Sequence, residues 1–207
     1  MALKDLTDII QSAAVTIASI VAIYGINAWK DEFIGKRRIE LAEEVLAIFY
    51  QARDAIEAIR SSFGYEGEGK TRKPGPNEKP EHAEALDRAY VLIERYNKHN
   101  DVFSRLHALR YRFMAQFGAE ASAPFDDLNG LINELLMAAR HKVWLATVPE
   151  WSLRSEEAME KHHQEWIANE RIYYSGGKDD PIAPRLAKII TDIESRCQPI
   201  IEKSDHK

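Results

Sequence analysis

The most specific chemical motif in this sequence is a match to a phosphate-binding loop. Residues 64–71, GYEGEGKT, satisfy the pattern G-x-x-x-x-G-K-[ST]. Such a loop needs a strand before it and a helix directly after it, because backbone N–H groups and the helix N-terminus surround the phosphates. Here a helical pattern precedes the motif, KPGPNEKP follows it, and Glu66 and Glu68 would repel a phosphate. We therefore predict that the match arises by chance.

Two arginine–histidine pairs approach a pattern used by some helical ribonuclease domains, in which four to six residues separate the two. Arg95 and His99 are separated by three residues, and Arg154 and His162 by seven. Both spacings fall outside the pattern. We interpret the first pair as a polar helix face or a contact within a helical bundle.

Histidine and glutamate also form one E-x-x-H element, Glu160 to His163. Helical di-metal sites use this element twice, with two further carboxylates, and the second copy is missing here. His162 and His163 would point about 100° apart on a helix, a poor arrangement for one metal ion. The lone Cys197 lies on an apolar helix face and is expected to be packed. We predict no catalytic residue, no metal and no cofactor.

Composition narrows the protein class. The 207 residues carry 28 Lys and Arg against 33 Asp and Glu, a net charge of -5, which argues against a general nucleic-acid binder. A single cysteine excludes an intrachain disulfide framework and fits a reducing compartment.

The segment Ile9–Trp29 is an uncharged run of 21 residues between Asp8 and Lys30. As a helix it would be about 31 Å long, close to the thickness of the bilayer hydrocarbon. A buried core helix is the alternative, and a cleaved signal peptide fits poorly because the run is too long and charged helix follows it. We predict a transmembrane anchor over residues 1–29.

Basic residues crowd the C-terminal end of this run, at Lys30, Lys36, Arg37 and Arg38, whereas only Lys4 precedes it. The positive-inside rule then places residues 30–207 in the cytoplasm. The expected protein is a single-pass inner-membrane protein with a cytoplasmic C-terminal domain.

The faces of the anchor differ in chemistry at about 100° per residue. One stripe is polar apart from Ile23: Asp5, Asp8, Ser12, Thr16, Ser19, Ile23 and Asn27. A second face is small and would allow close helix contact: Ala14, Ala18, Ala22 and Gly25. The polar stripe could line the lumen of a ring of copies, or its hydroxyls could bond back to their own helix.

The rest of the chain predicts an all-α bundle of about five helices, because its apolar positions recur at three and four residues. The first helix would continue from the membrane through Ile34, Leu41 and Ile56 to Phe63, followed by a flexible Gly- and Pro-rich loop at 64–80. Further helices are expected at 81–117, at 122–149, from Ser152 or Ser155 to Tyr174, and at 182–201.

Two stretches carry a resemblance to a known group: WKDEFIGKRRIELAEEVLAIFYQARDAIEAIR and RYNKHNDVFSRLHALRYRFMAQFG. They resemble a family of uncharacterised bacterial single-pass membrane proteins with a cytosolic helical domain, which brings no known activity. In build alone, the chain is similar to small membrane accessory proteins of bacterial antiviral systems, which form ring-shaped pores.

The function expected from these features is a membrane-anchored, self-associating scaffold or partner-binding module. Its expected partners are the bilayer, further copies of itself and an unidentified protein, but not nucleic acid. One alternative is a homo-oligomeric pore or antiviral-type effector, with Asp5 and Asp8 at its outer mouth and Ile23 as its constriction. The other, disfavoured by the motifs above, is a membrane-tethered nuclease or nucleotide hydrolase.

Overall fold

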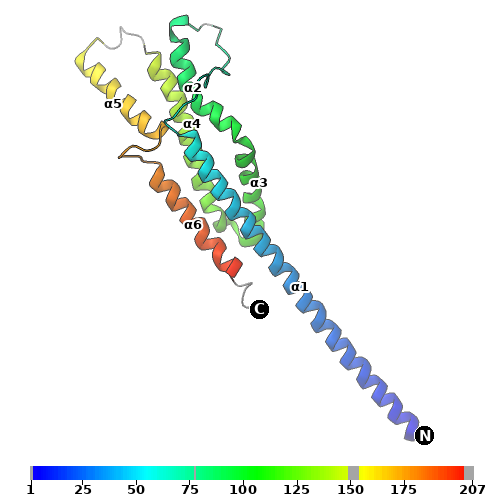
Figure 1. Cartoon of the computed structure of the whole chain (residues 1–207). Helices are drawn as coiled ribbons and strands as arrows, with labels where there is room; N and C mark the ends of the chain where they lie inside the picture. The colour runs from blue at the N-terminus through cyan, green and yellow to red at the C-terminus, as the bar shows by residue number, and fades with distance from the viewer. Residues whose placement is uncertain (1, 77, 149–153, 203–207) are drawn as a thin grey trace.

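A computed structural model of the chain (Figure 1) describes residues 2–76, 78–148 and 154–202, with side chains from residue 14 onward. These residues form six α-helices and no strand, which confirms the all-α prediction. The helices are α1 (Ala2–Ile59), α2 (Ala83–Lys98), α3 (Asn100–Phe117), α4 (Ala123–Ala146), α5 (Glu156–Tyr173) and α6 (Ala183–Glu202), with short 3₁₀ helices η1 (Pro80–His82) and η2 (Ala119–Ser122).

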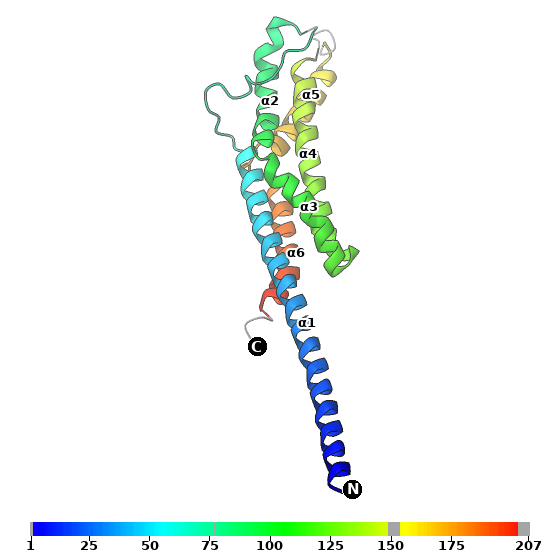
Figure 2. The same cartoon turned by 90° about the vertical axis from the view of Figure 1, so that its right-hand side faces the viewer.

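Helix α1 has two halves with different surroundings. It is 58 residues long and unbroken at Gly35, so it extends about 87 Å. Its N-terminal half stands clear of the other helices in both views (Figures 1 and 2). Its C-terminal half packs against α2, α3 and α6 through side chains spaced by three and four residues, which include the fully buried Val45, Ile48 and Ala52. The continuous first helix is as the sequence predicts.

The C-terminal end of α1 differs from the prediction. The helix ends at Ile59, and Phe63 lies beyond it with 84% of its surface exposed. The guanidinium of Arg95 donates hydrogen bonds to the carbonyls of Ile59 and Ser61, at 3.4 and 2.7 Å. These bonds satisfy acceptors that a longer helix would have used, so the chain can leave the helix here.

The predicted helix over 81–117 is in fact two helices that meet at His99, whose φ and ψ are -107° and 14°. Asn97, His99 and Asn100 are all weak helix formers, which lowers the cost of a break. Tyr96 and Phe103 stack across it, with ring centroids 5.0 Å apart. The bend lets α2 pack on α4 while α3 packs on α1.

Helix α4 is central to the body, because it contacts α2, α5, α6 and η2. It buries Leu128, Leu131 and Leu135 and ends at Ala146, three residues before Pro149, which lies outside the described residues.

Helix α6 packs on α1 on the side away from α3 (Figure 1) and buries Cys197 completely, as expected. Burial raises the pKa of the Cys197 thiol to about 12.

Helix α5 begins where the sequence indicates. Ser155 is its N-cap, and the Ser155 hydroxyl accepts a hydrogen bond from the backbone N–H of Ala158 at 3.1 Å. This satisfies one of the free donors of the first turn. Ser122 also precedes a helix as predicted, but its hydroxyl donates to the Ala119 carbonyl instead of capping α4.

Candidate functional site

The most unusual surface of the molecule is the projecting segment, residues 2–34 of α1. Among described residues, no side chain before Leu41 is buried. Among its described side chains, from residue 14 onward, the exposed large apolar ones are Val15, Ile17, Ile20, Val21, Ile23, Tyr24, Ile26, Trp29, Phe33 and Ile34. A row of apolar side chains on a helix without a neighbour is unfavourable in water. Each square ångström of apolar surface removed from water stabilises a protein or complex by about 25 cal/mol. Contiguous apolar surface of this kind is typical of a contact with a membrane or another protein.

The described residues include no helix that is both long enough and apolar enough to span a membrane. The uncharged run of the predicted anchor, residues 1–29, begins at Ile9, and the side chains of residues 9–13 lie outside those that the structure describes.

The predicted polar stripe is described only in part. The side chains of Asp5, Asp8 and Ser12 lie outside the described ones, whereas Thr16, Ser19, Ile23 and Asn27 are exposed. The Ser19 hydroxyl donates a hydrogen bond to the carbonyl of Val15, four residues earlier, at 2.8 Å. Ser19 is therefore satisfied within its own helix and does not need a lumen or a second copy.

The predicted small face is uncovered. Ala14, Ala18, Ala22 and Gly25 are all exposed, and a Cβ placed on Gly25 would meet nothing within 4 Å. A second helix could therefore approach the backbone of α1 closely along this face.

The loop that resembles a phosphate-binding motif is held against α2 by its own polar groups. The carboxylate of Glu94 accepts hydrogen bonds from the Gly69 N–H, at 2.8 Å, and from the Thr71 hydroxyl, at 2.9 Å. Burial opposes the charged form of Glu94, but these bonds and one from Lys98 hold its pKa below the usual range. Two of the donors that a phosphate would need are therefore occupied by a carboxylate.

A second contact fixes the same loop. The guanidinium of Arg95 forms a two-pronged ion pair with Glu68, at 2.6 and 3.0 Å, and donates to the Phe63 carbonyl at 2.7 Å. The hydrogen bonds from Arg95 hold the pKa of Glu68 below its usual range. The described residues between 64 and 79 form no helix or strand, in line with their composition, but the loop is tied to α2 at several points.

The other chemical motifs are not assembled into a site. Arg95 is occupied by Glu68 and backbone carbonyls, while His99 lies at the junction of α2 and α3. His162 is near the ring of Trp166, with centroids 6.4 Å apart. In the part of the chain that the structure describes, no three His, Cys, Asp or Glu residues are grouped so that they could hold a metal ion.

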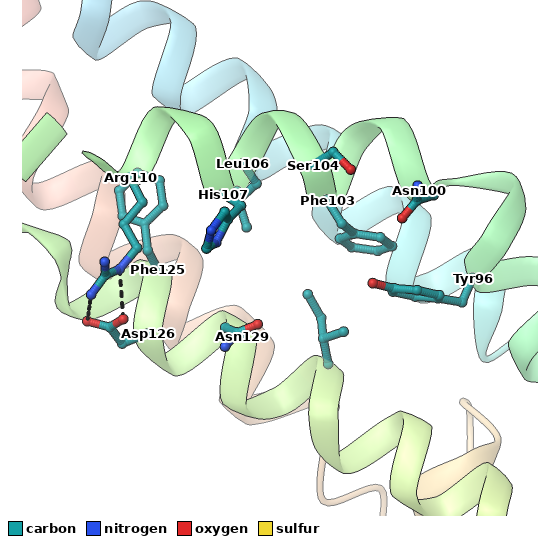
Figure 3. A pocket seen from close by; sticks show the side chains of 11 residues that line it. Tyr96, Asn100, Phe103, Ser104, Leu106, His107, Arg110, Phe125, Asp126 and Asn129 are labelled. Carbon is teal, nitrogen blue, oxygen red and sulfur yellow. Dashed lines mark hydrogen bonds and ion pairs between the residues drawn. The ribbon is translucent and has the colours of Figure 1, made fainter. Parts of the chain in front are cut away.

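A cleft of about 440 Å³ separates α3 from α4 (Figure 3). Its floor is formed by the buried Phe103, Leu106, Phe125 and Ile132, and its rim by the exposed Asn100, Ser104, His107 and Asn129. At one end Arg110 and Asp126 form a two-pronged ion pair at 2.8 and 3.2 Å. The ring of His107 packs edge-on against Tyr111 at 5.2 Å, and no hydrogen bond joins it to Ser104 among the described contacts. The cleft offers hydrogen-bonding side chains and one ion pair above an apolar floor.

A buried ion pair, which sequence analysis missed, joins three elements of the body. Arg60 and Asp180 are only 3% and 8% exposed, and two hydrogen bonds of 2.8 and 3.0 Å connect them. The same guanidinium donates to the carbonyls of Arg171, Ile172 and Tyr174, at 2.7 to 3.0 Å. One side chain at the end of α1 thus caps the end of α5 and holds the segment that leads into α6. Its place four residues after the buried Ile56, on the same helical face, is the sequence signal that could have indicated burial.

Lys142 on α4 is also buried, which its charge did not indicate. Its ammonium pairs with Glu170 and lies 4.2 and 4.4 Å from the ring centroids of Tyr173 and Tyr174. Aromatic faces attract a cation, so these rings stabilise the charge inside the α4–α5 contact. Burial also raises the pKa of Tyr173. This cluster is a structural contact between helices, with every group engaged.

Comparison with protein families, with curated proteins and with solved structures finds no match to this chain. The resemblance to bacterial single-pass membrane proteins therefore stays a prediction.

Proposed function

We propose that this protein is a membrane-anchored helical scaffold, with residues 9–29 in the inner membrane and residues 30–207 in the cytoplasm. The observation that carries the proposal is the row of exposed apolar side chains on the projecting segment, which no part of the described body covers. Residues 14–29 alone would extend about 24 Å, and residues 9–13 bring the uncharged run to about 31 Å. That length matches the hydrocarbon of a bilayer.

The charge distribution supports the orientation. Lys30, Lys36 and Arg37 are exposed just beyond the apolar run, and basic residues favour the cytoplasmic side. The body then lies on the side where a single thiol, such as that of Cys197, stays reduced.

Self-association is the second part of the proposal, and it rests on the small face of Ala14, Ala18, Ala22 and Gly25. A scaffold is favoured over a pore because the Ser19 hydroxyl already bonds to the Val15 carbonyl. Hydroxyls that satisfy themselves in this way need no water-filled lumen. The proposed role is non-catalytic, and nucleotide hydrolysis lost in Lys70→Ala would contradict it.

Extraction of membranes with alkaline carbonate tests the anchoring. The full chain should stay with the membrane pellet, because high pH disrupts the electrostatic contacts of peripheral proteins but does not release a helix buried in the hydrocarbon. Release into the supernatant would overturn the proposal. Reporter fusions at the C-terminus should report a cytoplasmic location, and an external location would overturn the orientation.

Native mass measurement in mild detergent tests self-association. The wild type should be oligomeric, and Ala18→Leu should reduce the oligomer because the larger side chain separates the backbones. Ile17→Leu, on the neighbouring lipid-facing side, is the matched control and should leave the oligomer intact. Monomers in the wild type would contradict self-association.

Measurement of ion leak distinguishes a pore from a scaffold. In a pore, Ile23→Ser would raise the leak and Ser19→Leu would block it, whereas a scaffold shows neither change.

A further inference from the structure

The basic residues that follow the projecting segment have different contacts. The guanidinium of Arg38 lies 5.3 Å from the ring centroid of Phe117 and donates a hydrogen bond to the Gln116 carbonyl at 3.3 Å. Arg38 is therefore attached to the end of α3. Its neighbour Arg37 points elsewhere, with its guanidinium 4.8 Å from the ring centroid of Phe33, and no described carboxylate or carbonyl bonds to it. Only Arg37 of this pair is available to a partner outside the chain.

Arg37 is the last member of a ladder of three side chains, Trp29, Phe33 and Arg37, spaced by four residues on α1. The rings of Trp29 and Phe33 stack with centroids 5.7 Å apart, and 66% and 45% of their surfaces are exposed. The ladder begins where the uncharged run ends. Tryptophan at such a position is typical of the membrane–water interface.

The geometry of the ladder fixes the depth of the charge relative to the indole. Arg37 follows Trp29 by eight positions, so their backbones are about 12 Å apart along the axis. The Arg37 guanidinium lies 4.8 Å from the ring centroid of Phe33, which is itself 5.7 Å from that of Trp29, so the charge is no more than about 11 Å from the indole. Each headgroup layer of a bilayer is roughly 5–8 Å thick. An indole at the edge of the hydrocarbon would therefore place this charge within reach of the lipid phosphates.

The charges around the two nearby lysines indicate which of them can bind an anion together with Arg37. Lys30 is seven residues earlier, two turns away on the same face, and is exposed. Lys36 instead has two carboxylates one turn away, Glu32 and Glu40, whereas Arg37 has only Glu40 and Lys30 has none three or four residues away. Lys30 and Arg37 therefore carry less neighbouring negative charge than Lys36.

The geometry points to a binding site for the phosphate of an anionic phospholipid, made by Lys30 and Arg37, with Trp29 setting its depth. This inference rests on the proposed membrane anchoring. A guanidinium suits a phosphate because its fork of donors matches two phosphate oxygens. Anionic lipid is preferred over zwitterionic lipid because the latter carries its own cation close to the phosphate. Arg38, bound to α3, takes no part.

Reconstitution of the full chain into lipid nanodiscs tests the site. The discs contain equal amounts of phosphatidylcholine and phosphatidylglycerol. The protein is released from them in a native mass spectrometer, and the bound molecules of each lipid are counted. Phosphatidylglycerol should be enriched in the wild type. Arg37→Gln should lower the enrichment about fivefold, the usual effect of one basic residue near a charged membrane surface. Arg38→Gln is the matched control and should change it less than twofold.

Equal retention of the two lipids by the wild type would overturn the inference, as would equal losses in Arg37→Gln and Arg38→Gln. Flotation of the full chain with vesicles of phosphatidylcholine alone separates this failure from that of the anchoring. A chain that floats with neutral vesicles but shows no lipid preference keeps the proposed function and loses the inference. A chain that floats with neither neutral nor anionic vesicles loses both.

Discussion

Removing the carboxylate of Asp180 should destabilise the body far more than removing that of its neighbour Asp179. Asp180 is 8% exposed and forms two hydrogen bonds with the guanidinium of Arg60, which is buried more deeply still. It also accepts hydrogen bonds from the N–H groups of Ile182 and Ala183, at the start of α6. In Asp180→Ala, the Arg60 charge would stay buried with only carbonyl partners.

The expected magnitude follows from that burial. Breaking one side of a buried ion pair costs about 3–5 kcal/mol, because the remaining charge loses its partner but not its desolvation. For a chain of this size, 1 kcal/mol shifts the melting temperature by about 2–4 °C. Asp180→Ala should therefore melt roughly 6–20 °C below the wild type. Asp180→Asn keeps an acceptor for the α6 amides, so its melting temperature should lie between those of Asp180→Ala and the wild type.

Asp179→Ala is the matched control. Asp179 is 66% exposed and lies 3.6 Å from the exposed guanidinium of Arg171, so the loss should be within about 1 kcal/mol. Melting is followed by near-ultraviolet circular dichroism of the full chain in mild detergent. The two variants should differ in melting temperature by more than about 2 °C. If Asp179→Ala and Asp180→Ala melt closer together than this, the energetic role assigned to the Arg60 pair is wrong.

The same pair predicts a pH dependence. Burial opposes the charged form of Asp180, but hydrogen bonds from Arg60 and from the Ile182 and Ala183 amides outweigh it and hold the pKa of its carboxyl below the usual range. A depressed pKa stabilises the fold above the unfolded value, near 3.9, and the contribution is lost as the pH falls through the folded value. The wild type should thus lose more stability in acid than Asp180→Ala. Parallel acid curves for the two would contradict this.

Two further predictions concern Gly69 and Cys197. Gly69→Ala should lower the melting temperature more than Gly67→Ala. Both glycines have positive φ, but only at Gly69 would the new Cβ lie 2.1 Å from a backbone oxygen, that of Asp87. Equal losses in thermal melts would argue against this. The Cys197 thiol should resist aromatic disulfide reagents in the native protein and react after denaturation, since it is fully buried and its pKa is raised; rapid labelling of the native chain would contradict the packing of α6.

Helix existence was predictable because it depends on local spacing, whereas helix ends were not. The apolar repeat through Val45 and Ile56 identifies α1 correctly, but it would continue to Phe63. The end at Ile59 depends on Arg95, which is far away in the sequence and bonds to the last carbonyls. The break at His99 likewise reflects the packing of α2 and α3 on different partners.

The candidate site was visible in the sequence because its signal is also local. An uncharged run with basic residues behind it can be read without knowing any contact, and the structure adds that the described part of this run has no cover within the chain. The loop at 64–80 is the opposite case. Its glycines and prolines indicate only that it is irregular, while its attachment to α2 depends on Glu94 and Arg95.

The sequence by itself determined that the chain is helical, where its apolar stripe lies, and that its N-terminal run carries no charge, because periodicity and charge are properties of neighbouring residues. Only the tertiary structure decided which of several similar charges are buried or occupied. Arg60 is buried while Arg53 is half-exposed, and Arg38 is attached to α3 while Arg37 is not. The cost and benefit of a charge depend on its desolvation and on partners that the fold brings from distant parts of the chain.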